Sequence, residues 1–216
     1  MTRAAHNRGA ILDAAALEIL DHGYAEASLS AIALRLGLSK GALSYHFPTK
    51  HLLATHLIQS LKDAIDQAYS RARTQYPESA AVGLVAFFVH LGATVSEHDV
   101  VRAGSALYLD RAIPPQEVIQ LAHTWNSHVT ALLTGAHDQG DLEPYTDPLT
   151  ASEYLLAATV GGIITSERSP RGGDRSPLHL TRLSLAAIGM KRADDIAERV
   201  LADLGPQSPV RLGSRA

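Results

Sequence analysis

Residues 28–50 read SLSAIALRLGLSKGALSYHFPTK, and this stretch decides the fold of the N-terminal part of the chain. It has the pattern of two short helices joined by a tight turn. Ser28 and Ser39 each stand where a helix N-cap is expected, and Gly37 lies where the chain must turn between the helices. Pro48 ends the second helix, because proline lacks an N–H and disfavours helical geometry in the preceding residue. The stretch therefore predicts a helix-turn-helix.

The second of these helices is too small and too polar to be a core helix. Leu43 and Phe47 are spaced i, i+4 and would anchor it from behind. The residues that would then face outward are Lys40, Gly41, Ser44, Tyr45 and His46. In a helix-turn-helix the second helix enters the major groove of DNA. DNA binding is therefore the leading hypothesis for the chain.

The composition favours an all-α protein. The chain has 216 residues, of which 46% are hydrophobic and only 5% aromatic, and alanine and leucine carry most of the apolar content. It contains no cysteine, which excludes disulfides, thiolate zinc sites and cysteine nucleophiles. No run approaches the roughly 20 apolar residues of a membrane helix, and the N-terminus lacks a signal-peptide pattern. We expect a cytoplasmic protein with no membrane partner.

The charge distribution gives only a weak electrostatic signal for nucleic acid. The net charge is −3, and residues 1–50 hold five Lys/Arg against four Asp/Glu. A few cations that touch phosphates would still suffice, because contacts that position a protein on DNA are individually local.

Apolar periodicity and breakers predict helices along the whole chain and no strands. The first helix covers 7–22 and is stopped by Gly23, which completes a three-helix unit with the two helices above. A long helix follows over 49–74. Further helices are expected over 78–97, 102–112, 116–139, 148–167 and 178–204, the last with a break near Gly189. Residues 168–177 are predicted to be a flexible loop.

We therefore predict three parts. Residues 1–50 form a helix-turn-helix DNA-binding domain, residues 51–204 form a helical ligand-binding and dimerisation domain, and residues 205–216 form a flexible tail.

The N-terminal quarter resembles the TetR family of transcriptional repressors. The resemblance is carried by 11–15 (ILDAA), 23–24 (GY), 29–33 (LSAIA), 37–43 (GLSKGAL), 45–47 (YHF) and 50–53 (KHLL). It implies that Lys40, Tyr45, His46 and Lys50 touch phosphates, that Gly41 lets the backbone approach the groove, and that Ser30 and Ser39 place hydroxyls at helix N-termini. Ser44 departs from the pattern of one branch of this family, in which an aromatic residue is usual at that position, and this puts the operator sequence in doubt.

A second resemblance is to the γ-butyrolactone receptor branch of that family. It is carried by 102–104 (RAG), Trp125, 140–142 (GDL), 147–148 (DP) and 158–161 (ATVG). It implies a homodimer on a palindromic operator, paired through the helices over 148–167 and 178–204. A small hydrophobic effector of γ-butyrolactone type would release the operator, and the genes controlled would be those of antibiotic or other secondary-metabolite synthesis.

The candidate effector residues each have a structural interpretation as well. Trp125, the only tryptophan, is either a core aromatic or the pocket wall that the resemblance implies. The hydroxyl of Thr159 either bonds back to its own helix or reaches a ligand. Phe87, Phe88 and Leu91 are expected to be core residues first and pocket lining second.

Other functions remain open at this stage. Residues 37–41 (GLSKG) match the G-x-S-x-G elbow of α/β-hydrolases, but that elbow needs a preceding strand, and none is predicted. Histidines in the pairs His51/His56 and His123/His128 are spaced by five, whereas metal pairs on helices use three or four, so no metal or other cofactor is expected. A pseudo-receptor, an exporter regulator or a helical ligand carrier are the alternatives.

Overall fold

The computed structural model describes the backbone of residues 3–168 and 177–204 and the side chains of residues 8–163 and 181–203. Within those ranges the chain forms α-helices and no strand, apart from one isolated antiparallel bridge between Leu142 and Met190. The predicted all-α class is confirmed. The predicted flexible loop between 168 and 177 and the predicted tail from 205 lie outside the described residues.

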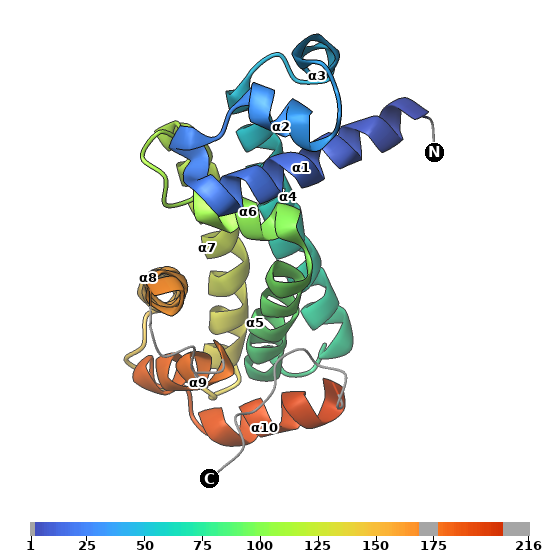
Figure 1. The fold of residues 1–216 in the computed structure, drawn as a ribbon. Coiled ribbons are helices and arrows are strands. Elements are labelled where there is room, and N and C mark those ends of the chain that lie inside the picture. The colour runs from blue at the N-terminus through green and yellow to red at the C-terminus, as the bar shows by residue number, and fades with distance from the viewer. Residues whose placement is uncertain (1–2, 169–176, 205–216) are drawn as a thin grey trace. The chain divides into compact units, whose positions relative to one another are not determined.

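Ten helices occur in the described ranges (Figure 1). They are α1 Arg3–Glu26, α2 Leu29–Arg35, α3 Lys40–His46, α4 Lys50–Gln75, α5 Ala80–Glu97, α6 Asp99–Leu107, α7 Pro115–Asp138, α8 Pro148–Arg168, α9 Pro177–Ala187 and α10 Ala193–Leu204. The packing forms two compact units: 1–64 with 94–121, and 65–93 with the chain from 122 onward. Helices α4, α5 and α7 contribute residues to both. The functional division at residue 50 stays a prediction.

Two predicted helices differ in their bounds from the structure. Helix α1 begins at Arg3 rather than at residue 7. The break predicted at Gly23 is present, because Gly23 has non-helical φ of 78° and ψ of 161°, and a short helical segment follows it to Glu26. Helix α6 covers 99–107 rather than 102–112. Residues after Leu107 form turns instead, in which Asp110 accepts a hydrogen bond from the Ala112 N–H at 2.8 Å. The predicted break near Gly189 is confirmed, where φ is 81°.

The helix-turn-helix is built as the sequence predicted. Ser28 Oγ accepts from the Ala31 N–H at 3.1 Å, and Ser39 Oγ accepts from the Ala42 N–H at 3.2 Å, so both serines are N-caps. Gly37 has φ of 64° in the turn, a conformation in which other residues are strained. The core of α1–α4 consists of Ile11, Ala14, Ala15, Ile32, Ala33, Leu43, Phe47 and Leu53.

Helix α6 packs against α1 and comes very close to α4. A Cβ at Gly104 would lie only 2.4 Å from the Leu57 carbonyl oxygen and 3.0 Å from the Leu61 Cβ. Only glycine allows the α6 and α4 backbones to approach this closely. Gly104 therefore sets the packing distance between the two helices within the first unit.

The second unit is organised around α5 and α7. Residues Ala80–Phe87 of α5 are buried, and α7 contributes Val129, Leu132, Leu133 and Ala136 to the same core. By length and composition α5 could cross a membrane, but 61% of it is buried inside the protein. That burial is the property of a core helix.

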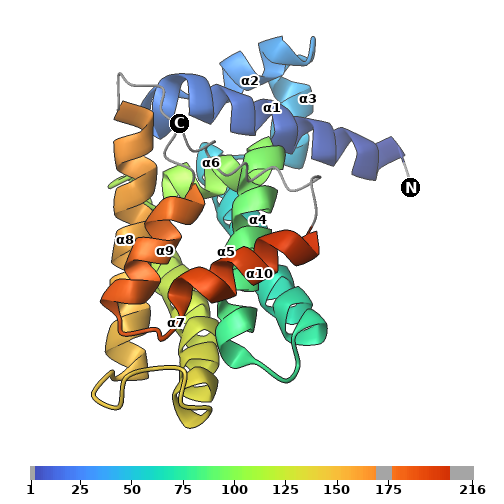
Figure 2. The ribbon, with the colours of Figure 1, turned by 90° about the horizontal axis from the view of Figure 1, so that it is seen from below.

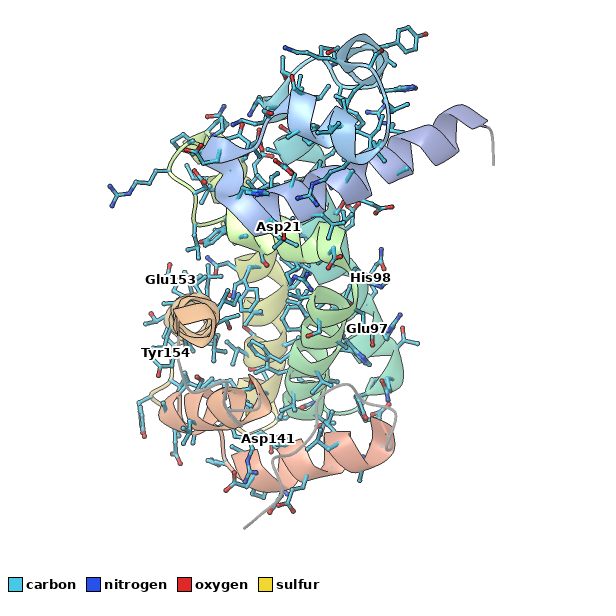
Figure 3. The ribbon with its side chains drawn as sticks, viewed as in Figure 1. Asp21, Glu97, His98, Asp141, Glu153 and Tyr154 are labelled. Atoms are coloured by element: carbon cyan, nitrogen blue, oxygen red, sulfur yellow. The ribbon has the colours of Figure 1, made fainter. Side chains whose placement is uncertain are left out.

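Helices α8, α9 and α10 complete the second unit, and α9 packs on both others (Figure 2). Asp147 caps α8, because its carboxylate accepts from the Thr150 N–H at 2.8 Å and the Thr150 hydroxyl at 2.7 Å. These bonds lower the pKa of Asp147. Asp141, labelled in Figure 3, ties the α7–α8 loop to the α9–α10 turn, since its carbonyl accepts from the Lys191 N–H at 2.8 Å.

The close approach at Gly104 yields a stability prediction. Gly104→Ala should destabilise the protein by about 1–3 kcal/mol, because the added methyl overlaps the α4 backbone. Gly9→Ala is the matched control in α1, where an added Cβ meets nothing within 4 Å. That variant should gain about 0.5–1 kcal/mol from helix propensity. Thermal unfolding measures both, and an unchanged Tm for Gly104→Ala would contradict the packing argument.

Candidate functional site

Helix α3 presents the predicted outward face. Leu43 and Phe47 are fully buried, and they hold the helix from behind. Lys40 and Gly41 are exposed, Tyr45 is 86% exposed, and Ser44 and His46 are partly exposed. Tyr45 and His46 meet edge to face with ring centroids 5.3 Å apart. The face thus offers a cation, a phenol, an imidazole and a hydroxyl, which are donors suited to phosphates and base edges.

The two serines of this surface differ in their local role. Ser39 accepts from the Ala42 N–H as a cap, and its own O–H is left to donate to an anion. Ser30 lies exposed in the first turn of α2. Ser39 follows helix α2 and a glycine turn, whereas a hydrolase elbow requires a strained turn after a strand. The G-x-S-x-G match is therefore an N-cap sequence and not a nucleophile elbow.

Lys50 is held more tightly than the sequence suggested. Its ammonium donates to the carbonyl oxygens of Tyr24 at 2.6 Å and Ala25 at 3.0 Å, and it lies 4.5 Å from the centre of the Tyr24 ring. Burial, with the nearby charges of Asp110 and Glu117, raises the pKa of Tyr24. Lys50 thus binds two carbonyl groups at the C-terminal end of α1, where the helix dipole makes a positive charge favourable. One of its three N–H groups is left for the predicted phosphate contact.

Arg35 is committed to ion pairs inside the first unit. Its guanidinium donates to Glu18 at 2.6 Å and to Asp21 at 2.7 Å, and these bonds raise its pKa (Asp21 is labelled in Figure 3). Glu18 is buried, so the pair joins α2 firmly to α1. The sequence could not reveal this pairing, because the partners lie 14 and 17 residues away.

Trp125 lies at the centre of an aromatic cluster in the second unit. Its ring meets Phe87 at 5.5 Å and Phe88 at 5.6 Å between centroids, both edge to face. Trp125 is 3% exposed and Phe87 is fully buried, whereas Phe88 is partly exposed. The indole N–H donates to the Ser152 carbonyl at 3.3 Å. The three predicted aromatic residues therefore do come together, and the indole donor already has a partner.

The remaining predicted effector residues have structural partners too. The Thr159 hydroxyl donates to the Leu155 carbonyl at 2.8 Å, one turn back along α8, so its oxygen is left as an acceptor. Leu91 is buried in α5. The sequence missed a polar link beside Trp125: the buried Ser152 hydroxyl donates to the Asn126 side chain at 2.9 Å. Trp125 and Asn126 are adjacent in the sequence, and no helical or strand spacing indicates that both would bond to Ser152.

Two of the histidines considered as metal ligands, His51 and His128, each contact a carboxylate on a different helix. His51 approaches Glu117 at 3.3 Å, and His128 contacts Asp66 at 2.6 Å while stacking on Tyr69 at 4.2 Å between centroids. In the described part of the chain no three His, Asp or Glu side chains gather as metal ligands would.

The chain is similar in sequence to known bacterial regulatory proteins. Residues 11–57 match the family model of bacterial regulatory proteins of the tetR family. The A-factor receptor protein of Streptomyces griseus is 25% identical to the chain, in an alignment that covers 99% of this chain and 72% of the receptor.

Solved structures share the fold. A γ-butyrolactone receptor described as ArpA-like superposes with a TM-score of 0.74 at 23% identity, covering 92% of this chain and 98% of the receptor. SmeT, the repressor of the Stenotrophomonas maltophilia multidrug efflux pump SmeDEF, superposes with a TM-score of 0.69 at 25% identity, covering 83% of this chain and 89% of SmeT.

The cap role of Ser39 can be tested by stability. Ser39→Ala should cost about 1 kcal/mol, because the Ala42 N–H loses its acceptor, and Ser39→Asp should restore most of that stability. Ser30→Ala is the matched control and should stay within about 0.5 kcal/mol of the wild type. Chemical denaturation measures the three variants. Equal losses for Ser39→Ala and Ser30→Ala would contradict the assignment.

Proposed function

We propose that this chain, which belongs to the TetR family of transcriptional regulators, represses secondary-metabolite genes as a dimer and releases its palindromic operator when a γ-butyrolactone-type signal binds. The observation that carries the proposal is the geometry of α3. Its apolar residues Leu43 and Phe47 are fully buried, while Lys40 and Tyr45 project from it into solvent. A helix fixed in this way can enter the major groove without losing its support.

The proposed operator contacts follow from where the α2–α4 residues lie. Lys40, Ser39 and Ser30 would contact phosphates, as would the remaining N–H of Lys50. Gly41 would allow close backbone approach, and Ser44, Tyr45 and His46 would contact the operator from the outward face of α3. Because Ser44 is small and half-buried, Tyr45 is the dominant projection of this face.

A dimer is required for a palindromic operator, because two recognition helices must lie about one DNA turn apart, roughly 34–36 Å. We assign the dimer contact to α8 and α9. Exposed apolar side chains lie on both helices: Leu149 and Tyr154 on α8, and Leu183 on α9, with 47–56% of each accessible. In Figure 3, Tyr154 and Glu153 lie on the side of α8 that is turned away from α7.

The effector would bind against the aromatic cluster of Phe87, Phe88 and Trp125. Aromatic walls suit a neutral, mostly apolar molecule, and a lactone ring brings only hydrogen-bond acceptors. The indole N–H is the side-chain donor that belongs to the three rings of this cluster, and it is bonded to the Ser152 carbonyl. A lactone would therefore stack on the ring, or take the N–H away from Ser152 and shift α8 against α7.

Release follows as a shift between two populations. The aromatic cluster lies on α5 and α7, and both helices contribute residues to the unit that holds α3. A ligand that prefers another arrangement of these helices lowers the population that fits DNA. Coupling of about 1–3 kcal/mol would weaken DNA binding about 5- to 150-fold.

A second candidate within the family is a regulator of an exporter, or a pseudo-receptor that senses an antibiotic. The similarity to a multidrug-efflux repressor favours it. The aromatic cluster would accept such compounds as readily as a lactone. Either regulator would act in the cytoplasm, where the DNA is.

The DNA-binding proposal is tested by the salt dependence of affinity. Duplexes selected with the wild-type protein from a randomised library serve as the probe. Lys40→Ala should reduce the slope of log affinity against log salt by about 0.9, because one phosphate contact is lost. Arg73→Ala, which removes an exposed cation near the end of α4 in the second unit, should leave the slope unchanged. If no duplex is selected, or both variants behave alike, the proposal fails.

The effector proposal is tested at Trp125. Trp125→Phe keeps an aromatic ring but loses the N–H and the larger face. It should retain operator affinity within about threefold and lose at least about tenfold in release by a synthetic γ-butyrolactone with an alkyl side chain, as expected for a lost ligand contact of about 1.4 kcal/mol. In the wild type, binding of the lactone should change the fluorescence of this single tryptophan.

Three outcomes at Trp125 distinguish the interpretations. Lost release with intact DNA binding supports a ligand contact. Equal loss of both, with a lowered Tm, makes Trp125 a core residue. Wild-type release by hydrophobic antibiotics and not by the lactone favours the exporter regulator.

A further inference from the structure

Arg8 of α1 is held at the C-terminal end of α3. Its guanidinium lies 4.9 Å from the centre of the Phe47 ring, and Phe47 directly follows α3 as its C-cap. The same guanidinium donates to His56 Nε2 on α4 at 2.7 Å. His56 itself meets the Phe47 ring edge to face at 5.5 Å. Three elements therefore fix the position of one arginine that remains exposed to solvent.

The charge of Arg8 is not neutralised by any described side chain. His56 accepts the hydrogen bond, and both burial and the charge of Arg8 lower the pKa of His56, so His56 is neutral at pH 7. Among the described side chains, no carboxylate lies within ion-pair distance of Arg8. Arg35 in the same unit is the opposite case, since two carboxylates neutralise it. A fixed, exposed and unneutralised guanidinium is suited to bind an anion.

The position of Arg8 complements that of Lys40. Lys40 is the first residue of α3, and the Arg8 guanidinium lies against the ring of Phe47, the C-cap at the other end of this helix. The seven-residue helix itself is about 10 Å long. The major groove is about 12 Å wide and is bordered by a phosphate backbone on each side. A helix that enters the groove with a cation at each end can therefore contact phosphates at both borders.

We infer that Arg8 is a phosphate-binding residue of the operator interface, pre-positioned by the Phe47 ring and the imidazole of His56. The inference rests on the proposed DNA-binding function of α3. Among the residues that the structure describes, only His56 takes one of the five N–H groups of Arg8, which leaves four for phosphate oxygens. The ring and the imidazole restrict the side chain before binding, so less conformational entropy is lost in the complex. A phosphate contact of this kind positions the protein and carries no sequence preference.

The test is the salt dependence of binding to the selected duplexes, measured for Arg8→Gln. Glutamine removes the charge but keeps an N–H that can donate to His56, so the packing around Phe47 is largely preserved. The slope of log affinity against log salt should fall by about 0.9. Between 50 and 200 mM salt, the wild type should accordingly lose about threefold more affinity than the variant. Arg8→Lys keeps a cation and should retain most of the slope.

The controls separate this role from a structural one. Arg8→Gln should retain the wild-type preference for the selected duplex over a scrambled duplex, since phosphate contacts affect both equally. A variant with lower affinity but the wild-type slope would show that Arg8 only supports Phe47, and the inference would be overturned. If the wild type binds no duplex, the proposed function itself fails. If Lys40→Ala loses slope and Arg8→Gln does not, only the inference on Arg8 fails.

Discussion

The burial of Phe47 is the constraint on which the N-terminal unit depends. This ring ends α3, fills the core beside Ile11 and Leu53, and contacts His56. With Leu43 it decides which residues of a seven-residue helix point outward, because a helix that short has too few internal hydrogen bonds to be stable by itself. Lys40 and Tyr45 are exposed as a direct consequence. The candidate DNA-binding surface of α3 therefore lies opposite the side chains that pack into the core.

Local signals predicted most of the helices. Ser28 and Ser39 cap their helices by accepting from an N–H three residues further on, and Gly37 adopts the positive φ of the turn. Because these interactions are local, the sequence pattern is enough to predict them. Helix α6 was placed wrongly because no capping signal marks its bounds: His98 at the N-cap makes no side-chain cap hydrogen bond, and Tyr108 stands at the C-cap. The packing of α6 was not predictable either. Gly104 lies against the α4 carbonyl of Leu57, 47 residues earlier, and no local signal marks such a contact.

The sequence predicted which residues form the candidate DNA-binding surface, but not the ion pairs and hydrogen bonds of its cations. Spacing identified its outward residues, but the state of each cation depends on partners that are distant in the sequence. Arg35 is neutralised by Glu18 and Asp21, Lys50 is tied to the end of α1, and Arg8 meets His56 across 48 residues. Net charge alone would count these cations as equal. Their geometry shows that they are not, and only an unneutralised one adds to the salt-dependent part of DNA affinity.

In the second unit, too, the sequence identified the residues but not their hydrogen-bond partners. Phe87, Phe88 and Trp125 were predicted as candidate pocket residues, and their rings do cluster. The indole N–H, however, is bonded to the Ser152 carbonyl on α8. An effector that competes for this N–H would have to replace a contact that joins α7 to α8. Ser152 lies inside α8, where its carbonyl also accepts the N–H four residues further along the helix, so the loss of the indole donor does not leave this carbonyl without a partner. What such an effector removes is therefore the link between the two helices, at little cost in unsatisfied hydrogen bonds.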